Sequence, residues 1–162
     1  MRLINRLIVH QARLSNVDQE TTMTRIFTPF LAALLLATAP MAASAAEEKV
    51  VYHVNDSANA RVALNNVNNH LNAAPDARIV VVTHGKGIDF LLKGAEDANG
   101  NPYEIGVQTL KSRGVDFRVC NNTLKSRKLD ASDVVEEATV VPSGVAEIGK
   151  LQAKEGFVYL KP

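Results

Sequence analysis

Five short runs rich in Val, Ile, Tyr and Phe alternate with longer segments in which apolar residues recur at helical spacing. The runs lie at 49–55, 78–84, 115–120, 138–141 and 157–160. Each is typical of a β-strand, because β-branched and aromatic residues favour extended backbone. The intervening segments are long enough for the right-handed crossovers that join parallel strands. The pattern therefore predicts a three-layer, Rossmann-like α/β fold: a largely parallel sheet of about five strands with helices on both faces.

The run at 78–84 is apolar at successive positions without alternation, as in a strand covered by helices on both sides. We expect it to be central. The segment 58–73 predicts an amphipathic helix, which Pro75 prevents from continuing. Two further helices are predicted. One follows Pro102 and extends to about residue 111, with Ile105 and Leu110 inward, and the other begins near Gly144 and places Val145, Ile148, Leu151 and Gln152 on one face.

The amino-terminal part follows a different pattern. Arg25 precedes an apolar run at 26–39, and the small residues Ala43 and Ala45 follow it, as in a secretory signal peptide. The apolar run is shorter than the roughly 20 residues of a comfortable transmembrane helix. We expect cleavage after Ala45, with Ala46 as the second choice.

This interpretation divides the chain into three parts. Residues 23–45 form the signal peptide, and 46–162 form a single mature domain located in the periplasm or secreted, with no membrane association after cleavage. Residues 1–22 contain acidic residues that do not suit a basic leader. We interpret them as a non-native upstream extension and place the true start at Met23. The alternative is an amphipathic amino-terminal helix that belongs to the fold.

Composition and charge argue against one class of function. The chain has 162 residues, of which 46% are hydrophobic and 22% charged, values ordinary for a globular protein. Its net charge is only +1, and it has no basic stripe with interleaved aromatic residues. These features argue against nucleic-acid binding.

The single cysteine, Cys120, stands where the third predicted strand ends. The carboxyl ends of parallel strands are where open α/β sheets usually carry their sites. A helix amino terminus after Cys120, together with Arg118, Lys125, Arg127 and Lys128, is expected to lower the pKa of the thiol and to activate it. The alternative is an inert buried cysteine.

Three histidines are candidate bases for a nucleophilic cysteine: His53, His70 and His84. Only His84 follows a neighbouring strand and so opens onto the same edge as Cys120. His70 falls within a predicted helix and His53 within a strand. A hydrogen-bonded loop histidine is the alternative role for His84.

The turn Gly85-Lys86-Gly87 follows the central strand but lacks the complete glycine motifs of dinucleotide and Walker loops. A tight turn explains both glycines, although its backbone amides can also hold a small anion, with Lys86 as the charge partner. The histidines and the cysteine have no metal-ligand spacing such as C-x-x-C. We therefore predict no metal site and no cofactor.

Three ordered motifs carry a family resemblance. They are Val-Val-Val-Thr-His-Gly-Lys-Gly at 80–87, Cys-Asn-Asn-Thr-Leu at 120–124, and Val-Pro-Ser-Gly-Val-Ala-Glu-Ile at 141–148, continued by the tail at 155–162. Together they resemble the exported branch of the DsrE/DsrF-like family over essentially the whole mature chain. The resemblance implies a compact α/β fold, assembly into homotrimers or hexamers, and a cysteine that carries sulfane sulfur as a persulfide.

Cys120 matches the sulfur-carrying position. The leading hypothesis is an exported sulfur carrier in which Cys120 cycles between thiolate and persulfide, in exchange with a donor or acceptor protein. In it His84, Asn121 and the amides of Asn122 and Thr123 hold the anion. One alternative is a non-catalytic oligomeric module that binds a small anion or metabolite near His84, Gly85 and Lys86. Another is a cysteine hydrolase that requires His84.

Overall fold

The computed structural model describes residues 47–162, so the predicted extension 1–22 and signal peptide 23–45 lie outside the described residues. The five predicted strands form one sheet with the order β4-β3-β2-β1-β5, and all four pairings are parallel. The predicted α/β fold is confirmed. The strands are β1 (Lys49–Val54), β2 (Arg78–Thr83), β3 (Asp116–Cys120), β4 (Ala138–Val141) and β5 (Val158–Leu160).

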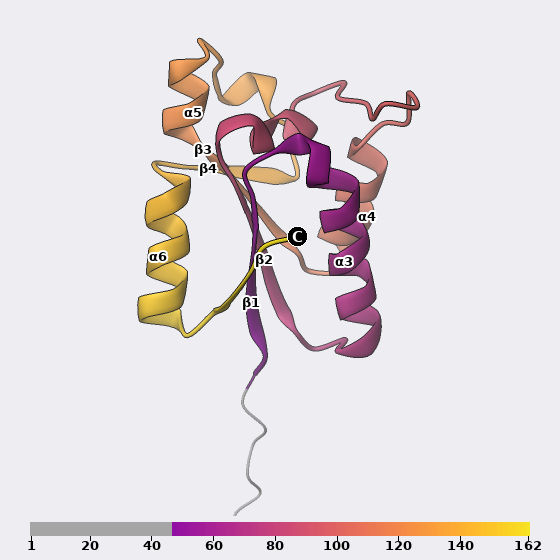
Figure 1. Ribbon diagram of the computed structural model, residues 1–162, viewed down its shortest axis with the longest axis vertical. Helices are drawn as coiled ribbons and strands as arrows, with labels where there is room; N and C mark the ends of the chain where they lie inside the picture. Colours follow the sequence, from indigo (N-terminus) through magenta and orange to yellow (C-terminus); the bar gives the residue numbers. More distant parts are fainter. Residues whose placement is uncertain (1–46) are drawn as a thin grey trace, which may run out of the picture. The chain divides into compact units, whose positions relative to one another are not determined.

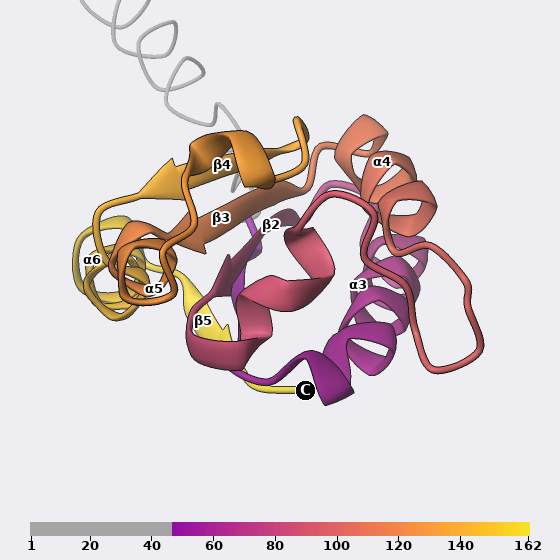
Figure 2. The same ribbon diagram turned by 90° about the horizontal axis from the view of Figure 1, so that it is seen from above.

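Helices cover both faces of this sheet. Helices α3 and α4 lie on one side of the sheet and α6 on the other, as both views show (Figures 1 and 2). Helix α5 follows the carboxyl end of β3, and its buried Leu124 belongs to the core on the α3 side. None of the helices within residues 47–162 is both long and apolar enough to cross a bilayer. The helical segments are η1 (Ser57–Asn59), α3 (Ala60–Ala73), η2 (Gly85–Leu91), α4 (Glu104–Ser112), α5 (Asn121–Ser126), η3 (Ala131–Asp133) and α6 (Gly144–Glu155).

Strand β2 is central, as its continuous apolar run predicted, and every residue of it after Arg78 is buried. Its side chains alternate between two cores. The larger core lies against α3 and α4 and includes Ile79 and Val81, whereas the smaller one lies against α6 and includes Val80 and Val82. Successive residues of β2 therefore point to opposite faces of the sheet.

Two predicted helix faces were partly wrong. Ile105 is 67% exposed and Val145 is 62% exposed, and Gln152 is exposed as well. In α4 the buried positions are Val107 and Leu110. In α6 they are Gly144, Ile148 and Leu151, which follow the i, i+4, i+7 spacing. A helix that packs on one sheet buries only a narrow stripe, so residues beside that stripe turn toward solvent.

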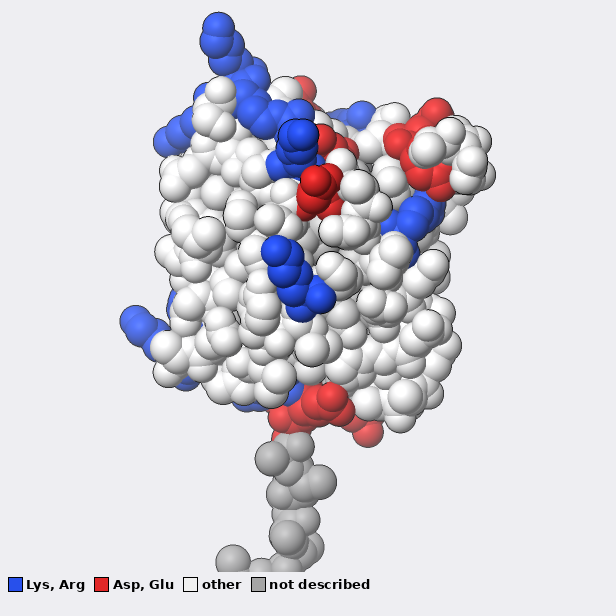
Figure 3. All heavy atoms as spheres, in the orientation of Figure 1, with Lys and Arg blue, Asp and Glu red and all other residues white. Residues whose placement is uncertain are grey.

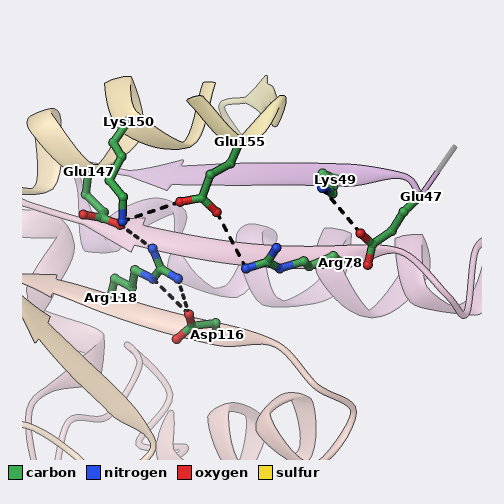
Figure 4. Close-up of polar contacts among 8 residues, drawn as sticks. All are labelled: Glu47, Lys49, Arg78, Asp116, Arg118, Glu147, Lys150 and Glu155. Carbon is green, nitrogen blue, oxygen red and sulfur yellow. Dashed lines mark hydrogen bonds and ion pairs between the residues drawn. The ribbon is translucent and has the colours of Figure 1, made fainter. Parts of the chain in front are cut away.

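A cluster of ion pairs ties α6 to the sheet (Figure 4). Arg118 of β3 pairs with Asp116 at 2.6 Å and also with Glu147 of α6. The remaining contacts extend the cluster along α6 to β2. They are Lys150–Glu147 and Lys150–Glu155, each 3.5 Å, and Arg78–Glu155 at 3.7 Å. Arg118 keeps only 15% of its side chain exposed, so the cluster fixes the position of α6 above β3.

Candidate functional site

The register of β2 and β3 brings two predicted site residues together. Thr83, the last residue of β2, is paired with Val119, so the next residues in line are His84 and Cys120. Neighbouring parallel strands lie about 4.8 Å apart. The two side chains share the α6 face, since Val82 and Arg118 stand two positions before them on that face. The prediction that His84 and Cys120 open onto one edge is confirmed.

The surroundings of Cys120 lower the pKa of its thiol. The residue is only 5% exposed, and burial alone raises the pKa of its thiol. Four donors outweigh this effect and leave the pKa lowered: the N–H of Gly144, the hydroxyl and N–H of Thr123, and the N–H of Asn122. Donors aimed at sulfur stabilise the thiolate rather than the thiol. Cys120 is therefore a partly activated nucleophile at the carboxyl edge of the sheet.

The cause of this lowering differs from the predicted one. Basic neighbours in the sequence were expected to activate Cys120, yet Arg118 is bound to Asp116 and Glu147, and Arg127 pairs with Asp89. Lys125 and Lys128 are exposed. Carboxylates thus neutralise both arginines, and hydrogen-bond donors supply the stabilisation in their place. The helix start after Cys120 contributes as predicted, through the N–H groups of Asn122 and Thr123.

Gly144 brings the amino terminus of α6 against the site. A Cβ atom at this position would lie 3.2 Å from the Cβ atoms of both Cys120 and His84, and 3.1 Å from the carbonyl oxygen of Thr83. Any other residue would be crowded there. The absent side chain allows the Gly144 N–H to reach the sulfur. The sequence motif 141–148 contained this glycine, but only the folded chain reveals its role.

Thr123 links the two loops at the sheet edge. Its hydroxyl oxygen accepts a hydrogen bond from the Gly85 N–H at 3.0 Å, and the same hydroxyl helps to lower the pKa of the Cys120 thiol. The Gly85 amide is thereby occupied, and Gly85 adopts a positive φ of 57° that suits glycine. Asn121 begins α5 directly after Cys120 and is half-buried. The predicted residues Gly85, Asn121, Asn122 and Thr123 thus surround Cys120 or its loop.

His84 is the first of three hydrogen-bonded side chains. Its Nε2 atom lies 2.7 Å from Nε2 of His53, and Nδ1 of His53 lies 2.7 Å from the hydroxyl of Tyr159. Burial lowers the pKa of His53 to about 4, with further contributions from His84 and Lys161, and burial and Lys161 also lower the pKa of His84. Both imidazoles are therefore neutral at neutral pH.

His53 and Tyr159 were missed because residues on different strands meet only once the register is known. His53 was set aside as a strand residue, yet it pairs with Val82 and so faces α6 beside His84. The sequence did contain one indication of where His53 lies. His53 alternates with the apolar residues Val50, Tyr52 and Val54, which places it on the opposite face near the carboxyl end of β1.

Lys86 lies apart from this group. It lines a cavity of about 630 Å³ together with Arg61, Glu96, Asp97, Tyr103 and residues 56–58, 98 and 99. Asp97 is bound by Arg61 and by the backbone of its own loop, and these hydrogen bonds lower its pKa to about 2. Neither Cys120 nor His84 lines this cavity. The structure therefore separates Lys86 from the cysteine.

His70 belongs to the other face of the sheet. Its Nδ1 atom is hydrogen-bonded to the Tyr52 hydroxyl at 2.9 Å, and its Nε2 atom lies 2.8 Å from the Oε1 atom of Glu48. Tyr52 is part of the α3 core, whereas Cys120 faces α6. Within residues 47–162 no three His, Cys, Asp or Glu side chains form a group that could hold a metal ion.

Comparisons with known proteins agree on the fold. MTH1491 from Methanobacterium thermoautotrophicum, a protein of unknown function, is 31% identical, with a TM-score of 0.65 over 72% of this chain and 100% of its own. The ychN protein from E. coli is 12% identical, with a TM-score of 0.60 over 71% of this chain and 99% of its own, and it shows the fold alone. No curated protein matches the chain significantly.

The family assignment rests on the longest of these matches. The profile of the DsrE/DsrF-like family matches residues 37–162, which include all the strands and helices described above. The three motifs 80–87, 120–124 and 141–148 come together at the edge where Cys120, His84 and Gly144 meet. The chain is a member of the DsrE/DsrF-like family.

Proposed function

We propose that the protein is an exported sulfur carrier, in which Cys120 accepts a sulfane sulfur atom, holds it as a persulfide and passes it to an acceptor. The DsrE/DsrF-like family has a sulfur-relay-type fold. The observation that carries the proposal is the place of Cys120 directly before the amino terminus of α5 and against Gly144 of α6, where N–H groups and the Thr123 hydroxyl lower the pKa of its thiol. They favour the thiolate, which is the form that attacks sulfur.

The chemistry balances without an external oxidant or reductant. The Cys120 thiolate attacks the sulfane sulfur of a donor such as thiosulfate or a persulfide. A new S–S bond forms, the S–S bond of the donor breaks, and its electron pair leaves with sulfite or thiolate. The reverse attack by an acceptor thiolate regenerates Cys120. The anionic outer sulfur of the persulfide stands near the same donors that stabilise the thiolate.

The small exposed fraction of Cys120 favours sulfur transfer over acyl hydrolysis. At 5% exposure the thiol has little room for a substrate larger than a terminal sulfur group. The second candidate, a binding module without turnover, draws on the cavity near Lys86, which is separate from the cysteine.

We also propose that the protein is exported and assembles into a homo-oligomer. Strand β5 is an edge strand whose three residues are all exposed, and Val158 is 61% exposed. In the view of Figure 3, β5 lies between α6 and α3, and charged side chains are sparse over much of this side of the domain. Both features support self-association through this edge, and the family resemblance implies a homotrimer or homohexamer. The signal-peptide pattern at 23–45 supports a periplasmic or secreted location, where a sulfur donor or acceptor protein would be met.

Intact-mass measurement tests the function. Reduced protein is incubated with thiosulfate or with an alkyl persulfide, and a mass gain of one sulfur atom that dithiothreitol reverses is expected. Cys120→Ser removes the acceptor and should abolish the gain while folding remains normal. No adduct from either donor, with Cys120 confirmed as reduced, would refute the sulfur carrier and favour the binding module.

A further inference from the structure

The three side chains Tyr159, His53 and His84 form a continuous hydrogen-bonded row across the α6 face. They come from β5, from β1 and from the residue after β2, which are neighbours in the sheet. The contacts are 2.7 Å between Tyr159 and His53 and 2.7 Å between His53 and His84. One end of the row is open to water, because Tyr159 is 37% exposed. The other end, His84, adjoins Cys120 across Gly144.

A neutral imidazole has one N–H donor and one bare nitrogen acceptor. If the Tyr159 hydroxyl donates to Nδ1 of His53, then Nε2 of His53 carries a proton and donates it to Nε2 of His84. The proton of His84 is then on Nδ1. The opposite orientation, with His84 donating to His53 and His53 donating to the tyrosine oxygen, is equally complete. The row can therefore pass a proton in either direction without forming an unpaired group.

We propose that Tyr159, His53 and His84 form a proton relay between solvent and the sulfur chemistry at Cys120. The inference rests on the proposed function and extends it. When an alkyl persulfide loads Cys120, the departing thiolate takes a proton from His84. His84 is refilled by His53, His53 by Tyr159, and Tyr159 by water, so one proton is consumed for each thiol released. His53 and Tyr159 act through His84 and are positioning residues.

The surroundings suit this role. The titratable groups that face the pair of imidazoles are Tyr159 and Lys161 from the carboxyl-terminal segment and Cys120 from β3, while α6 contributes the uncharged Gly144. Burial and the charge of Lys161 lower the pKa of both histidines. Two charged imidazoles would face each other with N–H donors on both Nε2 atoms and no acceptor between them, so the row requires at least one neutral ring.

A matched pair of tyrosine variants tests the relay. Tyr159→Phe removes the hydroxyl that contacts His53, whereas Tyr52→Phe removes an equivalent hydroxyl that contacts His70 on the other face. The rate of sulfur loading is measured from two donors. An alkyl persulfide releases a basic thiolate that requires a proton, whereas thiosulfate releases the weakly basic sulfite.

We expect Tyr159→Phe and His53→Gln to slow loading from the persulfide by about tenfold or more, as for the loss of assisted proton transfer. Loading from thiosulfate should stay near the wild-type rate, and Tyr52→Phe should change neither rate. A merely structural role for Tyr159 would slow both donors equally. That result, or an unchanged persulfide rate, would overturn the relay.

The sulfur-carrier function and the relay fail in different ways. If the wild-type protein accepts sulfur from neither donor, the function is refuted, and the hydrogen-bonded row is then tested by ¹⁵N NMR of the imidazoles. The expected result is that Tyr159→Phe shifts the ring nitrogens of both His53 and His84, while Tyr52→Phe shifts only those of His70. Unchanged His84 signals in Tyr159→Phe would show that no connected row exists.

Discussion

At the scale of single residues, the site depends on side chains that are neutral where charge was expected. The Cys120 thiolate is favoured by N–H and hydroxyl groups rather than by nearby basic side chains, and His84 meets a second imidazole. Neutral donors act only at hydrogen-bond range. Their effect therefore depends on the precise packing of α5 and α6 around the sulfur, whereas a charge would act from farther away.

The titration of His53 leads to a prediction about stability and pH. Its pKa falls from the ordinary 6.5 to about 4 in the folded protein. Between these values the unfolded chain binds the proton and the folded protein does not, so stability rises with pH across this window. The contribution of His53 is complete above pH 6.5 and is lost as the pH falls toward 4.

Replacing the group that titrates should weaken this dependence. We expect the free energy of unfolding of His53→Gln to change less between pH 7 and pH 4 than that of the wild type. Urea denaturation at a series of pH values measures the difference, and the carboxylates shared by both proteins cancel in the comparison. Parallel curves for the two proteins would contradict the lowered pKa.

At the scale of elements, the strands were predictable and their partners were not. The continuous apolar run identified β2 as central, and Cys120 was correctly placed at the end of β3. The pairing of β5 with β1 is a contact over more than 100 positions of sequence, as in the 106-residue separation of His53 and Tyr159. No local pattern encodes such a contact, which is why Tyr159 escaped the sequence analysis.

Helix α6 offers a matched pair of glycines for a test. Gly144→Ala would place a Cβ 3.1 Å from the Thr83 carbonyl oxygen and 3.2 Å from two Cβ atoms, so we expect a loss of about 1–3 kcal/mol in the free energy of unfolding. Gly149→Ala, in the same helix, meets no atom within 4 Å. It should add about 0.5–1 kcal/mol through helix propensity.

Chemical denaturation of both variants measures these changes in the free energy of unfolding. The Gly144→Ala protein should also alkylate more slowly at neutral pH, because displacement of α6 weakens the N–H contact to sulfur and raises the pKa of the thiol. Equal stability of the two alanine variants would show that α6 does not approach the site as closely as described.

At the scale of the whole molecule, the edge of the sheet at β5 is exposed and partly apolar. The edge at β5 carries exposed apolar residues, Val158 and Leu160, and also supplies Tyr159 to the proposed relay. An unprotected apolar edge strand invites pairing with another chain. Assembly through β5 would cover Val158 and Leu160, whose side chains alternate with that of Tyr159, and would bring a subunit boundary close to the solvent end of the relay.

The assembly is tested by placing charge on this edge. We expect the wild type to sediment as a trimer or hexamer and the double variant Val158→Glu, Leu160→Glu to sediment as smaller species, because buried like charges oppose association. Ile105→Glu is the control, since Ile105 is 67% exposed but lies on α4. A monomeric wild type, or a double variant that assembles normally, would refute the proposed interface.

The order of the segments along the chain affects when, during folding, the Cys120 thiol becomes reactive. The Gly144 N–H and the Tyr159 hydroxyl both belong to segments that follow Cys120 by many residues, and α6 must cross the sheet before β5 can join β1. Until then Cys120 is an ordinary cysteine with a pKa of about 8.5. Nucleophilicity at neutral pH therefore depends on segments that are synthesised after Cys120, and an incompletely folded molecule carries a less reactive thiol.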